Sequence, residues 1–425
     1  MFDITNSEID QEIGLKYYAT PKDLSIVDAR IRESFDDFVI QEVLRGGIIL
    51  PKENMDNFMA PLRGEGEYLR IILKKKGVDT LHVIGKLSKE MRIPISDVQF
   101  LGLKDSRGIA IQSISMRYKR GVYVDEIDKK CGKIKILRWY KAYAPLSSHE
   151  LWGNKFTVTI KVEKREDATS LITRMAQIQK ILSLSSIFSY FGYQRFGTEQ
   201  PFNHIIGKNI LNRNYDKALQ NMFKKGNYDI FNENKENEGE VLRNIFSKSN
   251  IEVVKFFLQS YQSFLFNKMI NKRIEKKIPL GEAINGDIVG PAETTLYREE
   301  DIIEVTENNR NKINYLIRRG ILSVLYPLPG YLTDRRKIPK EEAYEPIAKV
   351  LNEEKVTYND FSFKELPEIS LAGYYRPLTF KVYNFAWHLT KDDNIYCSFL
   401  LRKGGYATIV LREIIKPKNP KIVGF

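Results

Sequence analysis

A charged turn between two apolar segments is the stretch of the chain whose residue types most suggest chemistry. Residues 98–116 read VQFLGLKDSRGIAIQSISM, and Lys104, Asp105 and Arg107 gather at the turn. Nearby cations keep a partly buried Asp ionised, because they offset the desolvation that would raise its pKa. A carboxylate held in this way between two strands can act as a reaction centre. Asp, Ser and Gly are also common in ordinary turns, and these residues alone favour the turn interpretation.

Several other kinds of chemistry lack the residues to perform them. The sequence has no Walker A loop, no H-E-x-x-H and no C-x-x-C motif, its four histidines are scattered, and Cys131 and Cys397 are its only cysteines. Two cysteines form neither a disulfide framework nor a zinc site, which fits a reducing cytoplasm. No apolar run approaches the roughly 18 residues of a membrane helix. We therefore expect a cytoplasmic protein with no cofactor, no metal and no membrane contact.

The overall charge and the aromatic content point toward nucleic acid. The chain of 425 residues carries 67 Lys and Arg against 54 Asp and Glu, a formal charge of +13. Such an excess favours a polyanionic partner, although it says nothing about fold. The 23 Tyr and 23 Phe could stack on RNA bases, but most of them are expected to fill cores.

Hydrophobic patterns predict the elements that position the charged turn. A short strand over DFVIQEV, residues 37–43, would place Phe38 and Glu42 on one face, because alternate side chains of a strand share a face. A carboxylate on an apolar face is either paired or functional. Further strands are predicted over 67–77 and 155–163, and helices over 79–93, 167–184, 251–277 and around 338–352.

The later part of the chain gives less regular signals. The polar segment 207–250 is predicted to be a loop or a boundary between lobes, and 395–414 a strand, a turn and a second strand. Arg412 and Glu413 would close that second strand, and the sequence leaves open which of them faces the pocket. The helix over 251–277 ends in a basic cluster that is a candidate for phosphate contacts. Its members are Lys268, Lys272, Arg273, Lys276 and Lys277.

Three longer motifs together resemble one family. They are FLGLKDSRGIAIQ at 100–112, YFGYQRFG at 190–197 and GGYATIVLRE at 404–413, with DFVIQEV, GEGEYL, GNKFTVTI, LQSYQSFLFN and LPGY in the same order. The chain resembles, over essentially its whole length, the TruD family of tRNA pseudouridine synthases, in an archaeal-type form. Each motif alone is weak evidence, whereas five or more in order are strong.

The resemblance implies both a fold and a reaction. The fold would be mixed α/β (α+β): a pseudouridine synthase catalytic domain with a central antiparallel sheet, and an inserted α/β lobe. The implied domains are 1–208 and 379–425 for the catalytic part and 209–378 for the inserted lobe. The reaction would isomerise a uridine of tRNA, usually uridine 13, to pseudouridine without a cofactor. A monomer is expected.

The resemblance also implies site residues. Asp105 matches the family's catalytic carboxylate, which overturns the turn interpretation. The residues implied to border the substrate are Phe191, Phe38, Glu42, Arg32, Lys104, Ser189, Arg195 and Gln194. Lys104 would point to the opposite face from Asp105 if the strand continued, so a more distant Arg is the expected partner of that carboxylate.

Two of the implied positions have plainer interpretations, and two depart from the family pattern. Phe191 could be a core residue, and Glu42 a surface residue of an ordinary strand. Arg32 stands where many relatives carry Lys, so the planar guanidinium of Arg replaces the compact ammonium of Lys. Ser189 stands where many carry Asn, so a contact made by an amide in relatives would here pass through water or be lost.

Two other functions remain compatible with the sequence. The same two-lobed cleft could belong to a catalytically silent RNA-binding protein, although Asp105 argues against it. An RNA enzyme that excises or methylates a base is the third interpretation. Excision would release free uracil, and no loop for S-adenosylmethionine is visible in the sequence.

Overall fold

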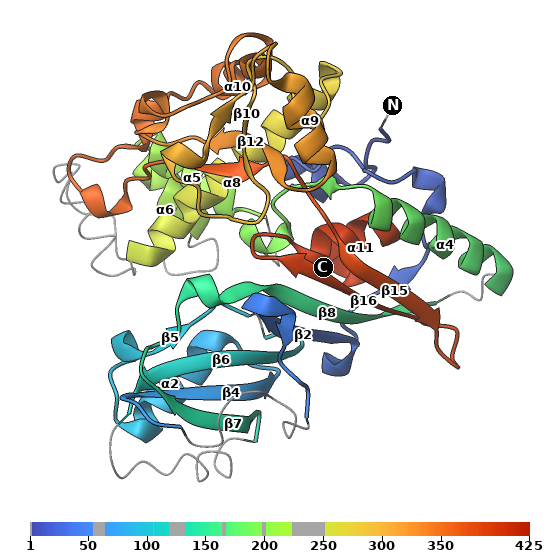
Figure 1. The fold of residues 1–425 in the computed structure, drawn as a ribbon, viewed down its shortest axis with the longest axis vertical. Helices are drawn as coiled ribbons and strands as arrows, with labels where there is room; N and C mark the ends of the chain where they lie inside the picture. The colour runs from blue at the N-terminus through green and yellow to red at the C-terminus, as the bar shows by residue number, and fades with distance from the viewer. Residues whose placement is uncertain are drawn as a thin grey trace.

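The computed structural model describes residues 2–53, 64–104, 106–118, 132–163, 167–197, 201–222 and 251–425. Asp105 and Cys131 lie outside these ranges. The expected mixed α/β class is confirmed: the described chain forms one large sheet, a second smaller sheet and helices packed on both (Figure 1). No helix within the described ranges is long and apolar enough to cross a membrane.

The large sheet has the mostly antiparallel character that was expected. Its main path runs β15-β16-β8-β2-β6-β4-β7, and every pair in it is antiparallel except β2 with β6. Its strands are β1 (Ala29–Arg30), β2 (Phe38–Leu44), β3 (Ile48–Ile49), β4 (Tyr68–Lys76), β5 (Gln99–Phe100), β6 (Ile109–Arg117), β7 (Ile134–Ala142), β8 (Leu151–Val162), β15 (Tyr383–Leu389) and β16 (Ile395–Arg402). β8 pairs with β2 on one side and β16 on the other, so late strands complete a sheet begun early in the chain.

The second sheet has the order β11-β10-β12-β13 and lies in the upper part of Figure 1 with α5, α6, α8, α9 and α10. Its strands are β10 (Ile288–Pro291), β11 (Ile303–Glu304), β12 (Leu322–Leu328) and β13 (Tyr374–Pro377). A separate short pair is formed by β9 (Ile187–Phe188) and β14 (Thr379–Phe380), and β14 follows β13 closely along the chain. Ser189 and Leu378, which adjoin this pair, are also joined by a backbone hydrogen bond of 2.9 Å.

The helices range from one turn to seven. They are α1 (Glu8–Glu12), α2 (Thr80–Met91), α4 (Ala168–Leu184), α5 (Asn203–Leu211), α6 (Tyr215–Met222), α8 (Ile251–Glu275), α9 (Arg310–Arg318), α10 (Glu341–Glu354), α11 (Ala407–Ile415) and α12 (Pro420–Val423). The predictions of helices over 79–93, 167–184, 251–277 and around 338–352 are confirmed by α2, α4, α8 and α10.

One face of the large sheet carries two separate groups of helices. Ala110 and Ile114 of β6 share this face, because they are four residues apart in a strand. Ala110 packs in the main core with residues of α4 and α11, whereas Ile114 packs with α2. The start of β6 therefore packs with one group of helices and its middle with the other.

Helix α11 contradicts the prediction of a second strand over the C-terminal part of 395–414. All nine of its residues are buried, including Arg412 and Glu413. A helix buried on every side lacks the polar face that reveals its period, and a short apolar run cannot be assigned by periodicity alone. Neither Arg412 nor Glu413 faces a pocket, because both are fully buried.

Segment 207–250 was predicted to be a loop or a boundary between lobes, and its first part is helical. α5 and α6 occupy residues up to Met222, and residues 223–250 lie outside the described ranges. Gly207 of α5 lies so close to α8 that a Cβ there would be 2.1 Å from the carbonyl oxygen of Phe257. Helix–helix packing at a glycine therefore holds a segment whose polar composition suggests a loop.

The basic cluster on α8 does not form a free cationic surface. Four of its five members form ion pairs, Lys268–Glu354, Lys272–Glu353, Arg273–Asp287 and Lys276–Glu345. Among the described residues only Lys277 of this cluster has no ion pair. Most of the cluster is therefore paired within the protein, and its role in phosphate contacts stays a prediction.

A buried ion pair joins the N-terminal segment to α11. The Arg412 Nε lies 2.7 Å from Asp10 Oδ2, and both side chains are fully buried. Asp10 Oδ1 also accepts a hydrogen bond of 2.6 Å from the Tyr193 hydroxyl. Arg412 donates to the carbonyl oxygens of Tyr17 and Leu15 at 2.9 and 2.8 Å. This network fixes α11 and the segment around Tyr193 to the start of the chain.

Removing one partner of this pair should destabilise the fold strongly. Asp10→Asn leaves Arg412 with only the more distant carboxylate of Glu413, at 3.7 Å, and Arg412→Met leaves the buried Asp10 carboxylate without this cation. We expect a loss of about 3–5 kcal/mol in the free energy of unfolding for either. The double variant should lose less than the sum of the two, because the sites are in contact. Urea denaturation at neutral pH measures all three values.

The matched control is Lys340→Met, which breaks an exposed pair with Glu304. It should change the free energy of unfolding by no more than about 1 kcal/mol. Additive losses at Asp10 and Arg412 would contradict the coupling.

His204 predicts how the protein responds to acid. The side chain is 6% exposed and its ring stacks on Phe264 at 4.8 Å. Burial lowers the pKa of His204 to about 4, against about 6.5 in an unfolded chain. The unfolded state therefore binds more protons between these values, so the free energy of unfolding should fall as pH drops from about 6.5 to 4, by roughly 3 kcal/mol in total.

Urea denaturation at several pH values tests this expectation. His204→Gln has no charge at any pH and should remove this part of the slope. A variant with an unchanged slope would assign the acid sensitivity to other groups.

Candidate active site

The surrounding structure holds the chain at Lys104, directly before position 105, and at Gly108, three residues after it. The Lys104 carbonyl accepts hydrogen bonds from Lys75 Nζ at 3.0 Å and from the backbone N–H of Thr80 at 3.2 Å. Lys104 N–H in turn donates to the Thr80 hydroxyl at 2.9 Å. On the other side, Gly108 packs so tightly that a Cβ would lie 2.4 Å from the carbonyl oxygen of Phe38. Asp105 itself lies outside the described residues.

Glu42 and Lys104 form a buried ion pair beside this turn. Lys104 Nζ lies 3.1 Å from Glu42 Oε1, and Glu42 Oε2 accepts the backbone N–H of Ser113 at 2.8 Å. Burial raises the pKa of Glu42 above its ordinary value, and the charge of Lys104 opposes that rise. Glu42 is therefore a paired, fully buried carboxylate and not the surface residue of the plainer interpretation. The charge of Lys104 is committed to it.

Phe38 and Arg32 form a second element at the start of β2. The guanidinium carbon of Arg32 lies 4.1 Å from the centre of the Phe38 ring, and Phe156 approaches edge-on at 6.2 Å. Phe38 is 1% exposed. Arg32 adopts φ +60°, an uncommon conformation for a residue with a Cβ. Arg32 covers this face of the Phe38 ring, so a base could stack on the ring there only if Arg32 moved.

The segment 189–197 forms a third element, built around Phe191. Asn267 of α8 holds its backbone on both sides: Phe191 N–H donates to Asn267 Oδ1 at 2.8 Å, and Asn267 Nδ2 donates to the Phe191 carbonyl at 3.2 Å. The Phe191 ring is 5% exposed and belongs to the main core. The guanidinium of Arg195 lies 5.6 Å from its centre. Gln194 is half-buried on the same 3₁₀ turn.

Ser189 is buried, and its backbone makes the contacts that the structure records. Its N–H donates to the Leu378 carbonyl at 2.9 Å, and its carbonyl accepts Arg376 Nε at 3.0 Å. The short hydroxyl is one of the groups lining a large cavity. Ser189 thus lies where the cavity borders the aromatic segment.

The sequence did not single out two residues of this cluster, Arg376 and Tyr406. The guanidinium of Arg376 lies 4.0 Å from the centre of the Phe191 ring, and the Tyr406 ring lies 5.9 Å from it. A cation inside the apolar run YYRPL was the available signal for Arg376. Tyr406 directly follows Gly404 and Gly405 in a quoted motif. Both contacts join residues about 190 or more positions apart, which periodicity cannot reveal.

Phe425 connects the charged turn with the aromatic segment. Arg107 Nη1 donates to the Phe425 carbonyl oxygen at 3.3 Å, and the Phe425 ring lies 5.2 Å from that of Tyr193. The side chain is 2% exposed. The preceding Gly424 adopts φ +96° and lies against the carbonyl of Ile31. The first and third elements are therefore parts of one packed region.

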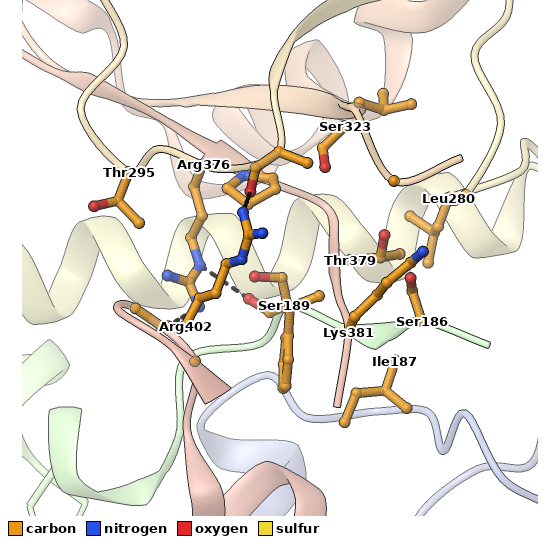
Figure 2. Close-up of a pocket in the computed structure, with 18 of the residues that line it drawn as sticks. Ser186, Ile187, Ser189, Leu280, Thr295, Ser323, Arg376, Thr379, Lys381 and Arg402 are labelled. Atoms are coloured by element: carbon orange, nitrogen blue, oxygen red, sulfur yellow. Dashed lines mark hydrogen bonds between the residues drawn. The ribbon is translucent and has the colours of Figure 1, made fainter. Parts of the chain in front are cut away.

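A cavity of about 2070 Å³ adjoins this region (Figure 2). It is lined by β13, by the ends of β15 and β16, and by residues near the ends of α4 and α8. Ser189 and Arg376 belong to its lining, whereas Phe38, Glu42 and Lys104 do not. Within the ranges that the structure describes, no group of three His, Cys, Asp or Glu side chains is placed to hold a metal ion.

Comparison with known proteins agrees over nearly the whole chain. A family model described as tRNA pseudouridine synthase D (TruD) matches residues 12–252 and 232–414. The protein named "Probable tRNA pseudouridine synthase D" of Methanosarcina acetivorans is 27% identical, with 96% of this chain and 97% of that one covered. Its namesake in Pyrobaculum islandicum is 27% identical, with 98% of each covered. A crystal structure from Methanosarcina mazei that carries the TruD name superposes with a TM-score of 0.67 and 25% identity, covering 97% of this chain and 98% of the other.

The burial of Phe191 leads to a stability prediction. Phe191→Ala should lower the free energy of unfolding by about 3–5 kcal/mol, because it leaves a cavity among Phe266, Tyr406 and Arg376. Phe191→Leu keeps most of the volume and should cost roughly half as much or less. Thermal melting of the two variants measures the difference. A loss below about 1 kcal/mol for Phe191→Ala would mean that the ring is exposed in solution.

Proposed function

The chain belongs to the tRNA pseudouridine synthase D (TruD) family, and we propose that it converts uridine 13 of tRNA to pseudouridine with Asp105 as its catalytic carboxylate. As a member of this family it is a pseudouridine synthase, an isomerase. The reaction breaks the N1–C1′ bond of the uridine, turns the base and joins C5 to C1′. Because no atoms are gained or lost, the chemistry asks for one poised carboxylate, a pocket for the extruded base and cations for the phosphates.

The observation that carries the assignment to Asp105 is the anchoring of the turn around it. Lys104 is bound through its backbone to Thr80 and Lys75, and Arg107 is bound to Phe425. A carboxylate that attacks a buried atom must be held in a fixed direction, and residues locked on both sides provide this. Lys104 is already paired with Glu42, so it does not neutralise a second carboxylate fully.

The residues around the turn take supporting roles in this proposal. Phe38 and Arg32 border the base, and the Glu42–Lys104 pair holds β2 and the turn together. Phe191 with Arg195, Gln194 and Ser189 forms the opposite border. We further propose that Phe191 acts mainly by supporting its neighbours, because its ring is 5% exposed.

The RNA is proposed to bind between the two sheets. Residues 209–378 are proposed as the inserted lobe and 1–208 with 379–425 as the catalytic domain. The change from the second sheet to the strands of the large sheet after Pro377 supports this division. A formal charge of +13 suits a partner as anionic as tRNA.

Asp105→Asn should abolish pseudouridine formation, by at least about 10³-fold in turnover, and leave the Kd for tRNA nearly unchanged. The amide is nearly isosteric but cannot act as the carboxylate does. Chemical mapping of pseudouridine in a transcribed tRNA measures the product and its position. Asp97→Asn, an exposed change near the same turn, is the control and should retain full turnover.

The assay also separates the alternatives. Turnover of Asp105→Asn within tenfold of the unmodified enzyme would remove Asp105 from the chemistry. Tight binding of tRNA without any product would indicate the silent RNA-binding protein, and release of free uracil would indicate excision. Product at another position would refute the assignment to uridine 13.

A further inference from the structure

Arg376 is a buried cation that no carboxylate of the described chain neutralises. It lies on β13, is 8% exposed, and donates only to carbonyl oxygens: Nε to Ser189 at 3.0 Å, and Nη2 to Gly404 at 3.0 Å and Tyr190 at 3.5 Å. Its Nη1 donates to none of the described residues.

The other two deeply buried arginines differ from Arg376 in this respect. Arg273 and Arg412 are each 2.7 Å from a carboxylate, that of Asp287 and that of Asp10 respectively. A buried charge is costly unless it is paired, and a protein normally supplies the counter-ion itself. At Arg376 that counter-ion is missing from the described chain.

The surroundings of Arg376 hold it in place without neutralising it. Its guanidinium carbon lies 4.0 Å from the centre of the Phe191 ring and 5.8 Å from that of Tyr406. Aromatic faces attract a cation, but they carry no opposite charge that would neutralise it. Burial lowers the pKa of Arg376 to about 10, so the group still carries its charge at neutral pH.

The cavity beside Arg376 has the chemistry of an anion site. Figure 2 shows Arg376 and Arg402 side by side near Ser189, with Lys381 further along the wall. Eight Lys and Arg side chains line the cavity, against three carboxylates. Two of those carboxylates are paired, Glu275 with Lys16 and Glu293 with Arg402. Of the cations, Lys381 and Lys403 have no ion pair with any described residue.

The size of the cavity favours a polymer over a small anion. About 2070 Å³ exceeds the roughly 300–1,000 Å³ of a typical small-molecule pocket. Hydroxyl groups of Ser186, Ser323 and Thr379 line the same walls (Figure 2) and can donate to phosphate oxygens or accept from a ribose hydroxyl.

We propose that Arg376 binds one phosphodiester of the substrate RNA, close to the target nucleotide, and that this cavity holds the RNA backbone next to it. The proposal rests on the proposed function, since RNA is the substrate in both. It adds that a residue of the second sheet touches the RNA beside Phe191 and Ser189. Arg376 is thereby a substrate-binding residue from the part of the chain that does not carry the charged turn.

Neutralising one phosphate at a time tests the contact. A series of tRNA fragments, each with a single methylphosphonate near the target, is titrated against the unmodified protein and Arg376→Gln. The unmodified protein should lose about tenfold in Kd at one position, the usual loss for a charge-assisted hydrogen bond. Arg376→Gln should bind normal RNA about tenfold more weakly and lose nothing further at that position. Its binding should also depend less steeply on salt, by about one unit of slope or slightly less.

Two companion variants keep the test decisive. Lys391→Gln removes one exposed charge from the turn between β15 and β16, and it should keep the full methylphosphonate effect. Arg376→Lys keeps the charge but not the planar fork, and it should show a methylphosphonate effect at least threefold smaller than that of the unmodified protein. If Arg376→Gln fails to fold, as circular dichroism would show, this lysine variant decides the question.

The outcomes distinguish this proposal from the proposed function. Equal methylphosphonate effects in the unmodified protein and in the folded Arg376 variant would overturn the phosphate contact, whatever the turnover. Displacement of RNA by millimolar inorganic phosphate from the unmodified protein with no methylphosphonate effect would indicate a site for small anions and overturn it as well. Failure of the unmodified protein to form pseudouridine would refute the proposed function alone, because Kd is measured without turnover.

Discussion

The buried pair of Asp10 and Arg412 is the interaction on which the packing around α11 depends. Arg412 is inside α11, so its 2.7 Å contact with Asp10 joins that helix to the N-terminal segment. The position of α11 in turn sets the positions of Tyr406, at its N-terminus, and of Thr408. Gly192 packs against this end of the helix, where a Cβ would lie 2.6 Å from the Thr408 hydroxyl oxygen. Tyr193 binds the same carboxylate. One charge pair therefore joins the helix and the aromatic segment to the start of the chain.

Hydrogen bonds from the Arg376 side chain to backbone carbonyl oxygens join the second sheet to neighbouring segments of the chain. Arg376 of the second sheet binds carbonyls of the 189–190 segment and of Gly404, which follows β16 of the large sheet. Substitution of the side chains at 189, 190 or 404 would not remove these carbonyl acceptors. The contact between the segments therefore depends on the Arg376 side chain and on the backbone path of β13, of residues 189–190 and of Gly404. The site is consequently a product of both sheets, and neither contains it alone.

The sequence predicted helices and strands with a clear local pattern better than contacts between distant residues. β2, β4, β8, α2, α4 and α8 follow from alternation or helical spacing, because each has a clear apolar face or a long uninterrupted pattern. α11 did not, since its nine residues are all buried. The family motifs identified Phe191 and Glu42, but whether Glu42 was paired depended on Lys104, 62 positions away. Arg376 and Tyr406 were missed for the same reason.

The position of β8 at the centre of the large sheet has a consequence for the growing chain. Its partner β16 is made only after positions 163 to 394, which are 232 residues, have been translated. At synthesis rates of about 5–20 residues per second, one edge of β8 stays unpaired for roughly 10–50 s. That edge belongs to a 12-residue strand carrying Phe156, Val158 and Ile160, and a long apolar edge invites pairing with other chains. The nascent protein should therefore depend on ribosome-associated chaperones until its last strands emerge.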